Sequence, residues 1–396
     1  MSLAKTFCSA PWFQLRLDWD GKYRPCCVFD ENQSTFSGRR EYSLHDTTMD
    51  EWMSSEYSQY LREELTKGNC IPECSTCWQD EDHGLQSVRQ TTNNTVTKNL
   101  GQNLDNTWVG SFLKKTKDYQ SYHLVSAEAK LSNVCNFSCA MCNPKDSSKI
   151  YDQWTKDQSN QFVQEKLSAA PTYFTDIVKN YQNMRGYQHL KDILAQPIQH
   201  IKVLGGEPLL DKTLFEIFAD QSVEKKSQIN LHFVTNGSQD LISVADTLAE
   251  YRSVNFVVSL EGIDQMQDYA RAGSHWSTVE SNILSAKQKG LTVSIHHTLQ
   301  AITILKLSEL IAWCKNNQIP INYGVLSSPD YLSISILPDN IRHIIKNTII
   351  DNSVNNLVNS LPIIPGKYPK FLEYISWYEK DFVVKLQDLC PELYFG

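Results

Sequence analysis

Six short β-type runs alternate with helical patterns between residues 122 and 330 of this chain. The runs cover residues 124–132, 200–205, 229–236, 254–262, 291–300 and 321–328. Parallel strands need long crossover connections, which are usually helical, so this alternation predicts a parallel α/β sheet. The sheet is either rolled into a partial barrel or left open. The tail from about residue 337 to the end is predicted to be mostly helical.

Unusual residues follow the ends of the first four strands. The stretch CNFSCAMC (135–142) follows the first strand and LGGEPLL (204–210) the second, while TNGS (235–238) and SLEG (259–262) end the third and fourth. Functional residues of parallel α/β folds gather at the C-terminal ends of the strands. We therefore expect these four segments to form one site.

The cysteines indicate metal ligation. Nine of the eleven lie in the first 142 residues, mostly in tight groups, and the N-terminus has no secretion-signal pattern. An odd number of clustered cysteines in such a chain favours metal binding over disulfides. Cys135, Cys139 and Cys142 provide three thiolates with no fourth cysteine nearby. They are either three ligands of a zinc ion with a distant fourth, or ligands of a [4Fe-4S] cluster whose fourth iron is open.

The order CNFSCAMC, GGEP, TNG and S-x-EG at successive strand ends resembles the radical S-adenosylmethionine (SAM) superfamily, over residues 122–330. The resemblance implies a partial (β/α)6 barrel in which Cys135, Cys139 and Cys142 hold a [4Fe-4S] cluster and SAM chelates the open iron. Met141 departs from the aromatic residue that often precedes the third cysteine. The long interval between Cys142 and Gly205 predicts an extra helix that helps to cover the active site.

The resemblance also implies which residues bind SAM. The GGEP motif binds its methionyl end, with the glycines allowing close backbone approach and the glutamate accepting from the ammonium group. TNG lies near the same end, S-x-EG near the ribose, and Arg271 pairs with the carboxylate. Taken alone, Arg271 is equally compatible with a solvated surface charge. The implied SAM-binding residues are Gly205, Gly206, Glu207, Pro208, Thr235, Asn236, Ser259, Glu261 and Arg271.

A second group of cysteines lies at the N-terminus, where Cys70, Cys74 and Cys77 repeat the spacing of the later three. The segment FCSAPWFQLRLDWDGKYRPCC (7–27) with the later C-x2-C resembles the SPASM and twitch auxiliary-cluster domains of radical SAM enzymes, although that module usually follows the barrel. The resemblance implies one auxiliary [4Fe-4S] cluster held by Cys8, Cys26, Cys74 and Cys77, with Cys27 and Cys70 as reserve ligands. A zinc knuckle built from the same four cysteines is the alternative.

The local pattern of this N-terminal segment is consistent with two short strands and a helix. Asp20-Gly21 is a favourable hairpin turn, and residues 47–68 predict one helix ending at Gly68. The predicted domains are an auxiliary-cluster domain (1–95), a linker (96–121), the barrel (122–330) and a helical C-terminal extension (331–396).

Other candidate residues have weaker signals. Cys314 and Cys390 have apolar helical neighbours and are predicted to be core thiols. His232, His296 and His297 lie on predicted strands, where each is either a core or surface residue or a proton-transfer group facing the cavity.

Composition limits the partners and location. The net charge is −8 and the cationic residues are scattered, which argues against a nucleic-acid partner. The apolar runs are far shorter than a membrane span, so we expect no membrane partner and a cytoplasmic location.

The predicted function is an oxidoreductase or transferase that cleaves SAM reductively to a 5′-deoxyadenosyl radical and abstracts hydrogen from its substrate. The substrate is a peptide or protein side chain, or alternatively a sugar, nucleotide or other small metabolite, and an electron donor such as flavodoxin or ferredoxin is needed. A zinc-binding scaffold without catalysis is the alternative of another class.

Overall fold

The computed structural model describes residues 4–37, 42, 44–82, 84, 86–100, 121–183, 185–349 and 351–394. The chain divides into two compact units. The first comprises residues 1–131, 178–204 and 213–231, and the second residues 132–177, 205–212 and 232–396. Among the described residues, no helix has the length and apolar character needed to cross a membrane.

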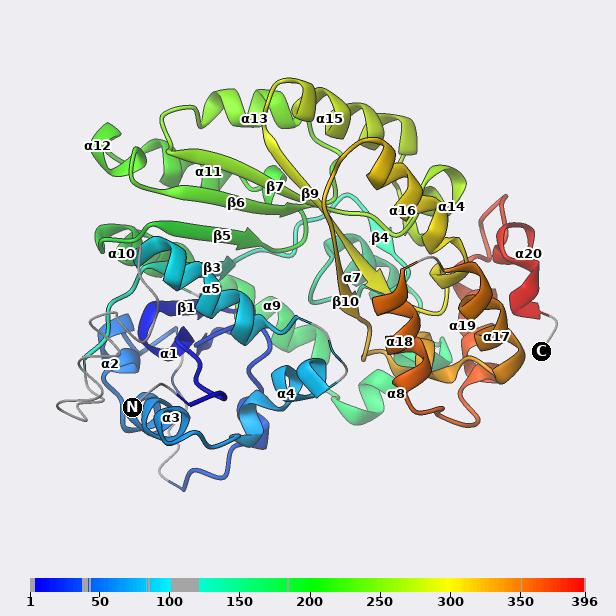
Figure 1. Cartoon of the computed structure of the whole chain (residues 1–396), viewed down its shortest axis with the longest axis horizontal. Coiled ribbons are helices and arrows are strands. Elements are labelled where there is room, and N and C mark those ends of the chain that lie inside the picture. The colour runs from blue at the N-terminus through cyan, green and yellow to red at the C-terminus, as the bar shows by residue number, and fades with distance from the viewer. Residues whose placement is uncertain are drawn as a thin grey trace. The chain divides into compact units, whose positions relative to one another are not determined.

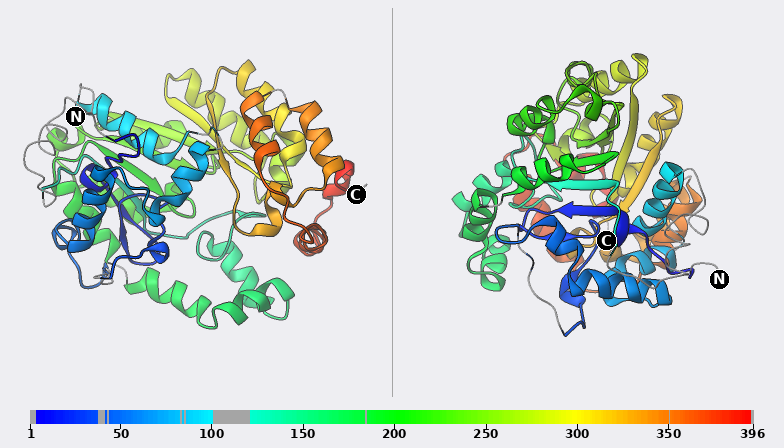
Figure 2. Two further views of the ribbon diagram at one scale, coloured as in Figure 1. Left: turned by 60° about the horizontal axis from the view of Figure 1, so that its bottom comes forward. Right: turned by 90° about the vertical axis from the view of Figure 1, so that its left-hand side faces the viewer.

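The first unit contains a four-strand run in the order β2-β1-β3-β5. Strand β1 (Gln14–Leu17) pairs antiparallel with β2 (Tyr23–Arg24) and parallel with β3 (Ser126–Lys130), which pairs parallel with β5 (His200–Leu204). Figure 2 shows β1 beside β3. The hairpin predicted at Asp20-Gly21 is therefore confirmed, with Gly21 at φ +72°. Its first strand, β1, lies beside β3 and so continues the sheet.

The remainder of the first unit is mostly helical. Residues 47–68 form two helices rather than the single helix expected, because Ser54 closes the first and Ser55 caps the next, its side chain accepting from the amide of Ser58. Gly68 ends the second helix at φ +87°, as predicted. The helices are α1 (Ala10–Phe13), α2 (Met49–Met53), α3 (Glu56–Lys67), α4 (Ser75–Asp82), α5 (Val88–Leu100), α10 (Gly186–Ala195), α11 (Lys212–Ala219) and α12 (Val223–Lys226).

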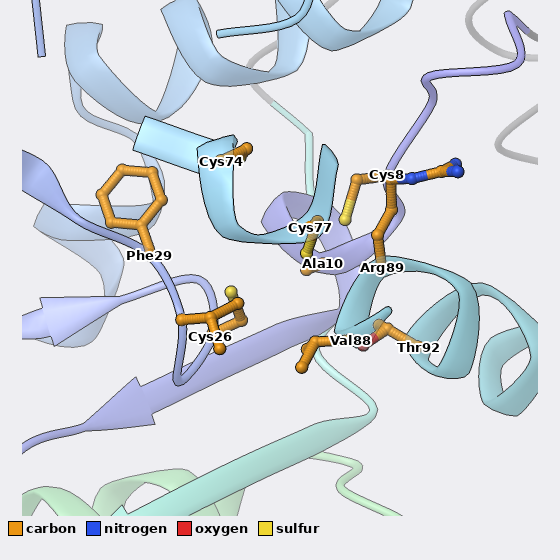
Figure 3. A pocket seen from close by; sticks show the side chains of 10 residues that line it. Cys8, Ala10, Cys26, Phe29, Cys74, Cys77, Val88, Arg89 and Thr92 are labelled. Carbon is orange, nitrogen blue, oxygen red and sulfur yellow. The ribbon is translucent and has the colours of Figure 1, made fainter. Parts of the chain in front are cut away.

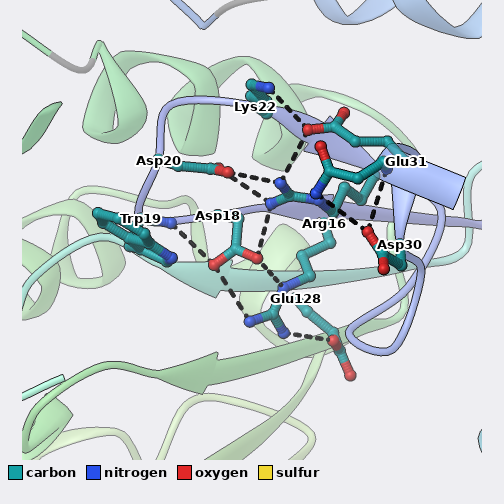
Figure 4. Close-up of polar contacts among 10 residues, drawn as sticks. Arg16, Asp18, Trp19, Asp20, Lys22, Asp30, Glu31 and Glu128 are labelled. Atoms are coloured by element: carbon teal, nitrogen blue, oxygen red, sulfur yellow. Dashed lines mark hydrogen bonds and ion pairs between the residues drawn. The ribbon is translucent and has the colours of Figure 1, made fainter. Parts of the chain in front are cut away.

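Buried charges hold β1, β3 and β5 in register. Arg16 lies opposite Glu128, which lies opposite Lys202. Glu128 accepts from Arg16 Nη1 at 2.9 Å and from Lys202 Nζ at 3.0 Å, and Arg16 also pairs with Asp18 (Figure 4). Because Arg16 and Glu128 are buried, each must be compensated by the other and by its neighbours.

The second unit contains β7 (Ser253–Ser259), β9 (Thr292–Leu299) and β10 (Ile321–Val325), which pair in parallel in this order, and a small antiparallel pair, β4 (Ser138–Cys139) with β8 (Arg271–Ala272). Helix α15 packs against β9 and α13 (Figure 1). The helices are α7 (Ser148–Lys156), α8 (Gln161–Ala169), α13 (Leu241–Thr247), α14 (Asp264–Ala270), α15 (Trp276–Gln288), α16 (Leu307–Asn316), α17 (Asp339–Thr348), α18 (Asn352–Ser360), α19 (Tyr368–Tyr378) and α20 (Leu386–Leu389). Strand β6 (Asn230–Thr235) and helix α9 (Tyr173–Asn183) each begin in one unit and end in the other.

All six predicted core strands are present as β3, β5, β6, β7, β9 and β10, and the C-terminal extension is helical. The fold is thus a mostly parallel α/β sheet with helices, as expected. The interval between Cys142 and Gly205 holds four helices, α7 to α10, where one extra helix was predicted. The proposed linker 96–121 begins inside α5, and its residues 101–120 lie outside the described part of the chain.

Replacing Glu128 by leucine tests whether these buried charges stabilise the pairing of β1, β3 and β5. The substitution leaves Arg16 and Lys202 without their shared carboxylate, and loss of one partner from a buried pair costs about 3–5 kcal/mol. We expect a lower denaturation midpoint in anaerobic urea titrations. Glu63→Gln, which removes an exposed partner of Lys67, serves as the control and should leave the midpoint unchanged. An equal midpoint for Glu128→Leu and the parent protein would contradict a stabilising role.

Candidate functional site

Cys135, Cys139 and Cys142 lie on one loop of the second unit, residues 132–142, called here the cysteine loop. Cys139 is buried and the other two are partly exposed. The amide of Phe137 donates to Cys135 Sγ at 3.4 Å. Burial raises the pKa of Cys135 to about 11, whereas a hydrogen bond with Cys142 lowers that of Cys139. The loop therefore presents three thiols, which would lose their protons on binding a soft metal.

Gly205 and Gly206 pack directly against the backbone that precedes Cys135. The amide of Gly206 donates to the carbonyl of Ser132 at 2.9 Å, and that of Glu207 to the carbonyl of Val134 at 2.7 Å. A Cβ on Gly206 would lie 2.5 Å from the carbonyl oxygen of Asn133, and one on Gly205 2.6 Å from that of Ser132. Both glycines are thus required for the approach of two backbone segments, a reason distinct from the access to SAM that the sequence suggested.

Glu207 is a buried carboxylate that joins the GGEP segment to TNGS. Its Oε1 accepts from Thr235 Oγ1 at 2.7 Å and from the amide of Leu209 at 3.1 Å, and its Oε2 accepts from the amide of Asn236 at 2.6 Å. Burial raises the pKa of Glu207 to about 7, against these hydrogen bonds, which lower it. Pro208, also buried, begins a short 3-10 helix at this corner.

Two further residues join the cysteine loop to TNGS. Asn136 accepts from Asn236 Nδ2 at 2.8 Å and donates to Ser238 Oγ at 3.0 Å. Neither Asn136 nor Ser238 was singled out from the sequence, although both lie inside the motifs that were. Three of the predicted strand-end segments are therefore brought together by direct hydrogen bonds, through Asn136, Glu207 and Asn236.

Arg271 and Glu261 form a buried ion pair beside Cys139. Arg271 Nη2 lies 2.9 Å from Glu261 Oε1, and Nη1 donates to Cys139 Sγ at 3.7 Å. The Glu261 side chain is fully buried, and its Oε2 accepts from the amide of Thr298 and from Gln300 Nε2, each at 3.2 Å. Arg271 is accordingly paired and its side chain is only 12% exposed, so it is not a solvated surface charge.

The arginine also retains one donor for a ligand. Nε of Arg271 is buried and has no hydrogen-bond partner among the described residues. A buried donor of this kind costs free energy unless a ligand or water satisfies it. The donor suits the carboxylate of a bound amino acid, while the three thiols suit iron.

His297 is the most buried of the three histidines considered. Its Nδ1 donates to the carbonyl of Leu260 at 3.0 Å and lies 3.5 Å from Glu261 Oε2. Burial lowers the pKa of His297. This residue is therefore a core histidine in the described structure, while Ser259 is partly exposed at the end of β7.

The C-terminal extension, to which the sequence assigned no role, contacts the cysteine loop. Tyr374 of α19 donates to the carbonyl of Ala140 at 2.5 Å, and Tyr378 to the carbonyl of Tyr269 at 2.9 Å. Trp377 and Cys142 both pack against the apolar cluster of Ile150, Trp154 and Val163. Helix α19 thus contacts the loop directly at Ala140 and shares an apolar cluster with Cys142.

The first unit contains a separate cavity lined by Cys8, Cys26, Cys74 and Cys77, the four cysteines predicted to act together (Figure 3). The empty space is about 320 Å³, part of it open to solvent. Burial raises the pKa of Cys8 to about 12 and also that of the other three. Four thiols from three separate segments are therefore collected around one space, as a fully ligated cluster requires.

The reserve cysteines do not line that cavity. Cys70 is exposed, whereas burial and, to a smaller extent, the charge of Glu128 raise the pKa of Cys27 to about 11. Cys314 and Cys390 are buried, as expected of core thiols. In the described part of the chain, no group of three or more His, Cys, Asp or Glu side chains is arranged to hold a single metal ion.

Comparisons with known families identify two domains. Residues 130–313 match the radical SAM superfamily, and residues 8–78 match the SPASM iron-sulfur cluster-binding domain. The second match confirms that the auxiliary module precedes the barrel in this chain. A comparison with curated proteins gave no match.

Similar solved structures include native anSMEcpe with bound AdoMet and Cp18Cys peptide, at 16% identity and a TM-score of 0.37, covering 66% of each chain. Streptococcus suis SuiB bound to S-adenosylmethionine has 13% identity and a TM-score of 0.39, covering 94% of this chain and 75% of that one. SuiB bound to precursor peptide SuiA has 14% identity and the same TM-score, covering 98% and 78%. The chain thus spans just under two thirds of the length of anSMEcpe.

Replacing Gly206 by alanine tests the packing behind the cysteine loop. The added Cβ forces the backbone at Asn133 and Val134 to move, so we expect destabilisation by about 1–3 kcal/mol and loss of iron from the neighbouring cysteines. The measurement is iron content and thermal unfolding after anaerobic reconstitution. As a control, Gly290→Ala meets no atom within 4 Å but has φ +85°, and should cost about 1 kcal/mol without loss of iron. Full iron retention by Gly206→Ala would contradict this role.

Proposed function

Because the chain is an enzyme with a radical SAM domain and an N-terminal SPASM domain, we propose that it cleaves SAM reductively and abstracts a hydrogen atom from a peptide or protein side chain. The observation that carries the proposal is the joining of CNFSCAMC, GGEP and TNGS through Asn136, Glu207 and Asn236. This places a three-thiol loop next to a buried carboxylate, as a cluster with an open iron and an amino-acid ligand requires.

We assign the SAM-binding cluster to Cys135, Cys139 and Cys142. When bound, the cluster and SAM together supply an electron and a cleavable sulfonium, which yield methionine and the 5′-deoxyadenosyl radical. The protein provides binding, orientation and exclusion of water. Tyr374 and Tyr378 contribute to that exclusion by holding α19 on the loop.

Polar residues around the loop bind SAM in this proposal. Glu207 accepts from the methionyl ammonium, since its carboxylate is rigidly held by Thr235 and Asn236, while Arg271 Nε donates to the carboxylate. Ser259 and Glu261 contact the ribose. Gly205, Gly206 and Pro208 shape the corner from which Glu207 projects.

We assign one auxiliary [4Fe-4S] cluster to Cys8, Cys26, Cys74 and Cys77. Four protein thiolates leave no open iron, so this cluster transfers electrons and does not bind the substrate directly. A flavodoxin or ferredoxin is the proposed donor to the enzyme, and the cytoplasm its proposed location. The domain boundaries 1–95, 96–121, 122–330 and 331–396 remain our proposed division by function.

The iron content of the protein distinguishes an enzyme with two iron-sulfur clusters from a zinc-binding scaffold. Anaerobically reconstituted protein should carry about 8 iron atoms per chain and release 5′-deoxyadenosine from SAM under dithionite. Combined Ala replacement of Cys135, Cys139 and Cys142 should remove about half of the iron and all cleavage. Cys314→Ala, which changes a buried thiol away from both groups, is the control. Zinc without iron after reconstitution would refute the radical function.

The same assay tests the auxiliary ligands. Ala replacement of Cys74 or Cys77 should reduce the iron content by up to half and leave the SAM-binding cluster signal, because the two sets are separate. Cys27→Ala and Cys70→Ala should retain all iron. Iron loss in either of these two variants would move that residue into the ligand set.

The raised pKa of Glu207 predicts a pH dependence of SAM binding. Below pH 7 the carboxyl is largely protonated and must lose its proton to accept from the ammonium group. The affinity for SAM should therefore fall by up to about tenfold per pH unit as the pH drops below 7. Isothermal titration between pH 6 and 8 measures this, with proton release detected in buffers of different ionisation enthalpy. Glu207→Gln should bind weakly without that proton release, and an identical pH profile in both proteins would exclude Glu207 as the titrating group.

A substrate screen distinguishes the two substrate classes. Peptides, sugars and nucleotides are compared for their acceleration of 5′-deoxyadenosine formation, and deuterium transfer from the labelled substrate locates the attacked carbon. Acceleration by peptides alone supports our proposal. Acceleration by a sugar or nucleotide supports the small-metabolite alternative.

A further inference from the structure

Arg271 is fixed beside the cysteine loop by its backbone as well as its side chain. Strand β8 pairs antiparallel with β4, with Arg271 opposite Cys139, and the amide of Ala140 donates to the carbonyl of Ala270 at 2.9 Å. From this position Nη1 reaches Cys139 Sγ at 3.7 Å. A guanidinium group is thus held permanently against one of the three loop thiols.

Glu261 compensates the charge of this guanidinium through the other terminal nitrogen, Nη2. The two side chains are 12% and 0% exposed, and their charged atoms lie 2.9 Å apart. Glu261 is itself held by Thr298 and Gln300, so it cannot turn away. The sulfur of Cys139 and the carboxylate of Glu261 therefore both contact the Arg271 guanidinium, in a region where solvent screening is weak.

We propose that Arg271 and Glu261 set the reduction potential of the cluster bound by Cys135, Cys139 and Cys142, with Arg271 raising it and Glu261 lowering it. The inference rests on the proposed function, because it requires that cluster. Reduction adds a negative charge to the cluster. A buried cation that donates to a ligand sulfur stabilises the reduced form, and an anion behind it offsets part of that effect. Net charge and hydrogen bonds to the sulfurs are the levers by which proteins tune such potentials.

Binding of SAM should itself change the reduction potential of the cluster, because both involve Arg271. Arg271 Nε is the donor, without a partner in the described part of the chain, that we assign to the SAM carboxylate. Bound SAM therefore places a second carboxylate, besides that of Glu261, against the same guanidinium. The potential is therefore to be measured without SAM, where only the charges of the protein act.

Arg271→Gln and Glu261→Gln test the inference because they change the charge in opposite directions. Each reconstituted variant is titrated with a redox mediator series and followed by electron paramagnetic resonance. The signal of this cluster is identified by its loss in the Cys135, Cys139 and Cys142 triple variant. We expect Arg271→Gln to lower the potential and Glu261→Gln to raise it. Each should change the ratio of reduced to oxidised cluster at the parent midpoint at least tenfold, about 59 mV for one electron.

Three further variants separate charge from structure. Arg271→Lys keeps the charge and should shift the potential less than Arg271→Gln. Arg342→Gln removes a partly buried guanidinium that, among the described residues, donates only to backbone carbonyls, those of Ser335, Leu337, Val358 and Leu361, and should leave the potential unchanged. The Arg271→Gln, Glu261→Gln double variant should return close to the parent potential.

Shifts in the same direction for both glutamine variants, or none in fully loaded protein, would overturn the inference. If Arg271→Gln does not retain the cluster, Glu261→Gln decides alone, and an unchanged or lower potential refutes the proposal. Failure of the parent protein to bind the cluster is a different result, since it refutes the proposed function itself.

Discussion

The close contact between two backbone segments, Gly205–Gly206 and residues 132–134, is the constraint on which the site depends. It exists because two glycines lack the Cβ atoms that would meet the carbonyls of Ser132, Asn133 and Val134. Two amide hydrogen bonds then form across the contact. Residues 132–134 are the start of the cysteine loop and Cys135 follows immediately, so the direction of the loop is determined by this packing. Glu207 is placed by the same corner, and its hydrogen bonds carry the constraint on to the TNGS segment.

The pairing of buried charges is the second constraint, and in each unit the buried charged side chains are compensated by residues of the same unit. In the first unit, Arg16, Glu128 and Lys202 stand opposite one another on adjacent strands. In the second, Glu261, two residues after β7, contacts Arg271 of β8, Thr298 of β9 and Gln300 just after β9. Unpaired charges in these places would be costly. The first set therefore favours one strand register, and the Glu261–Arg271 pair positions two of the residues that we assign to SAM.

The strands and motif segments were predictable because their signals are local. A β-type run of five to eight residues and a motif at its end can be seen without knowing the partner strands, so the segments that contain Cys135, Glu207 and Asn236 were expected at one edge, where hydrogen bonds join them. Only one extra helix was predicted before Gly205, where α7 to α10 lie, and the break at Ser54 was missed because a helix end depends on a single cap. Asn136, Ser238 and Tyr374 act through partners far away in sequence, and only the folded chain identifies them.

The two cysteine groups differ in a way that bears on their chemistry. The cavity in the first unit is lined by four cysteines, and its cation, Arg89, is occupied by Glu81 and by backbone carbonyls. The loop in the second unit has three cysteines, and its cation both touches a thiol and keeps one donor free. A complete ligand set with a satisfied cation suits a centre whose surroundings do not change during turnover. A set of three thiols next to a donor without a partner suits a centre that gains a ligand during turnover. The negative charge of that ligand would then interact with the same arginine that contacts Cys139.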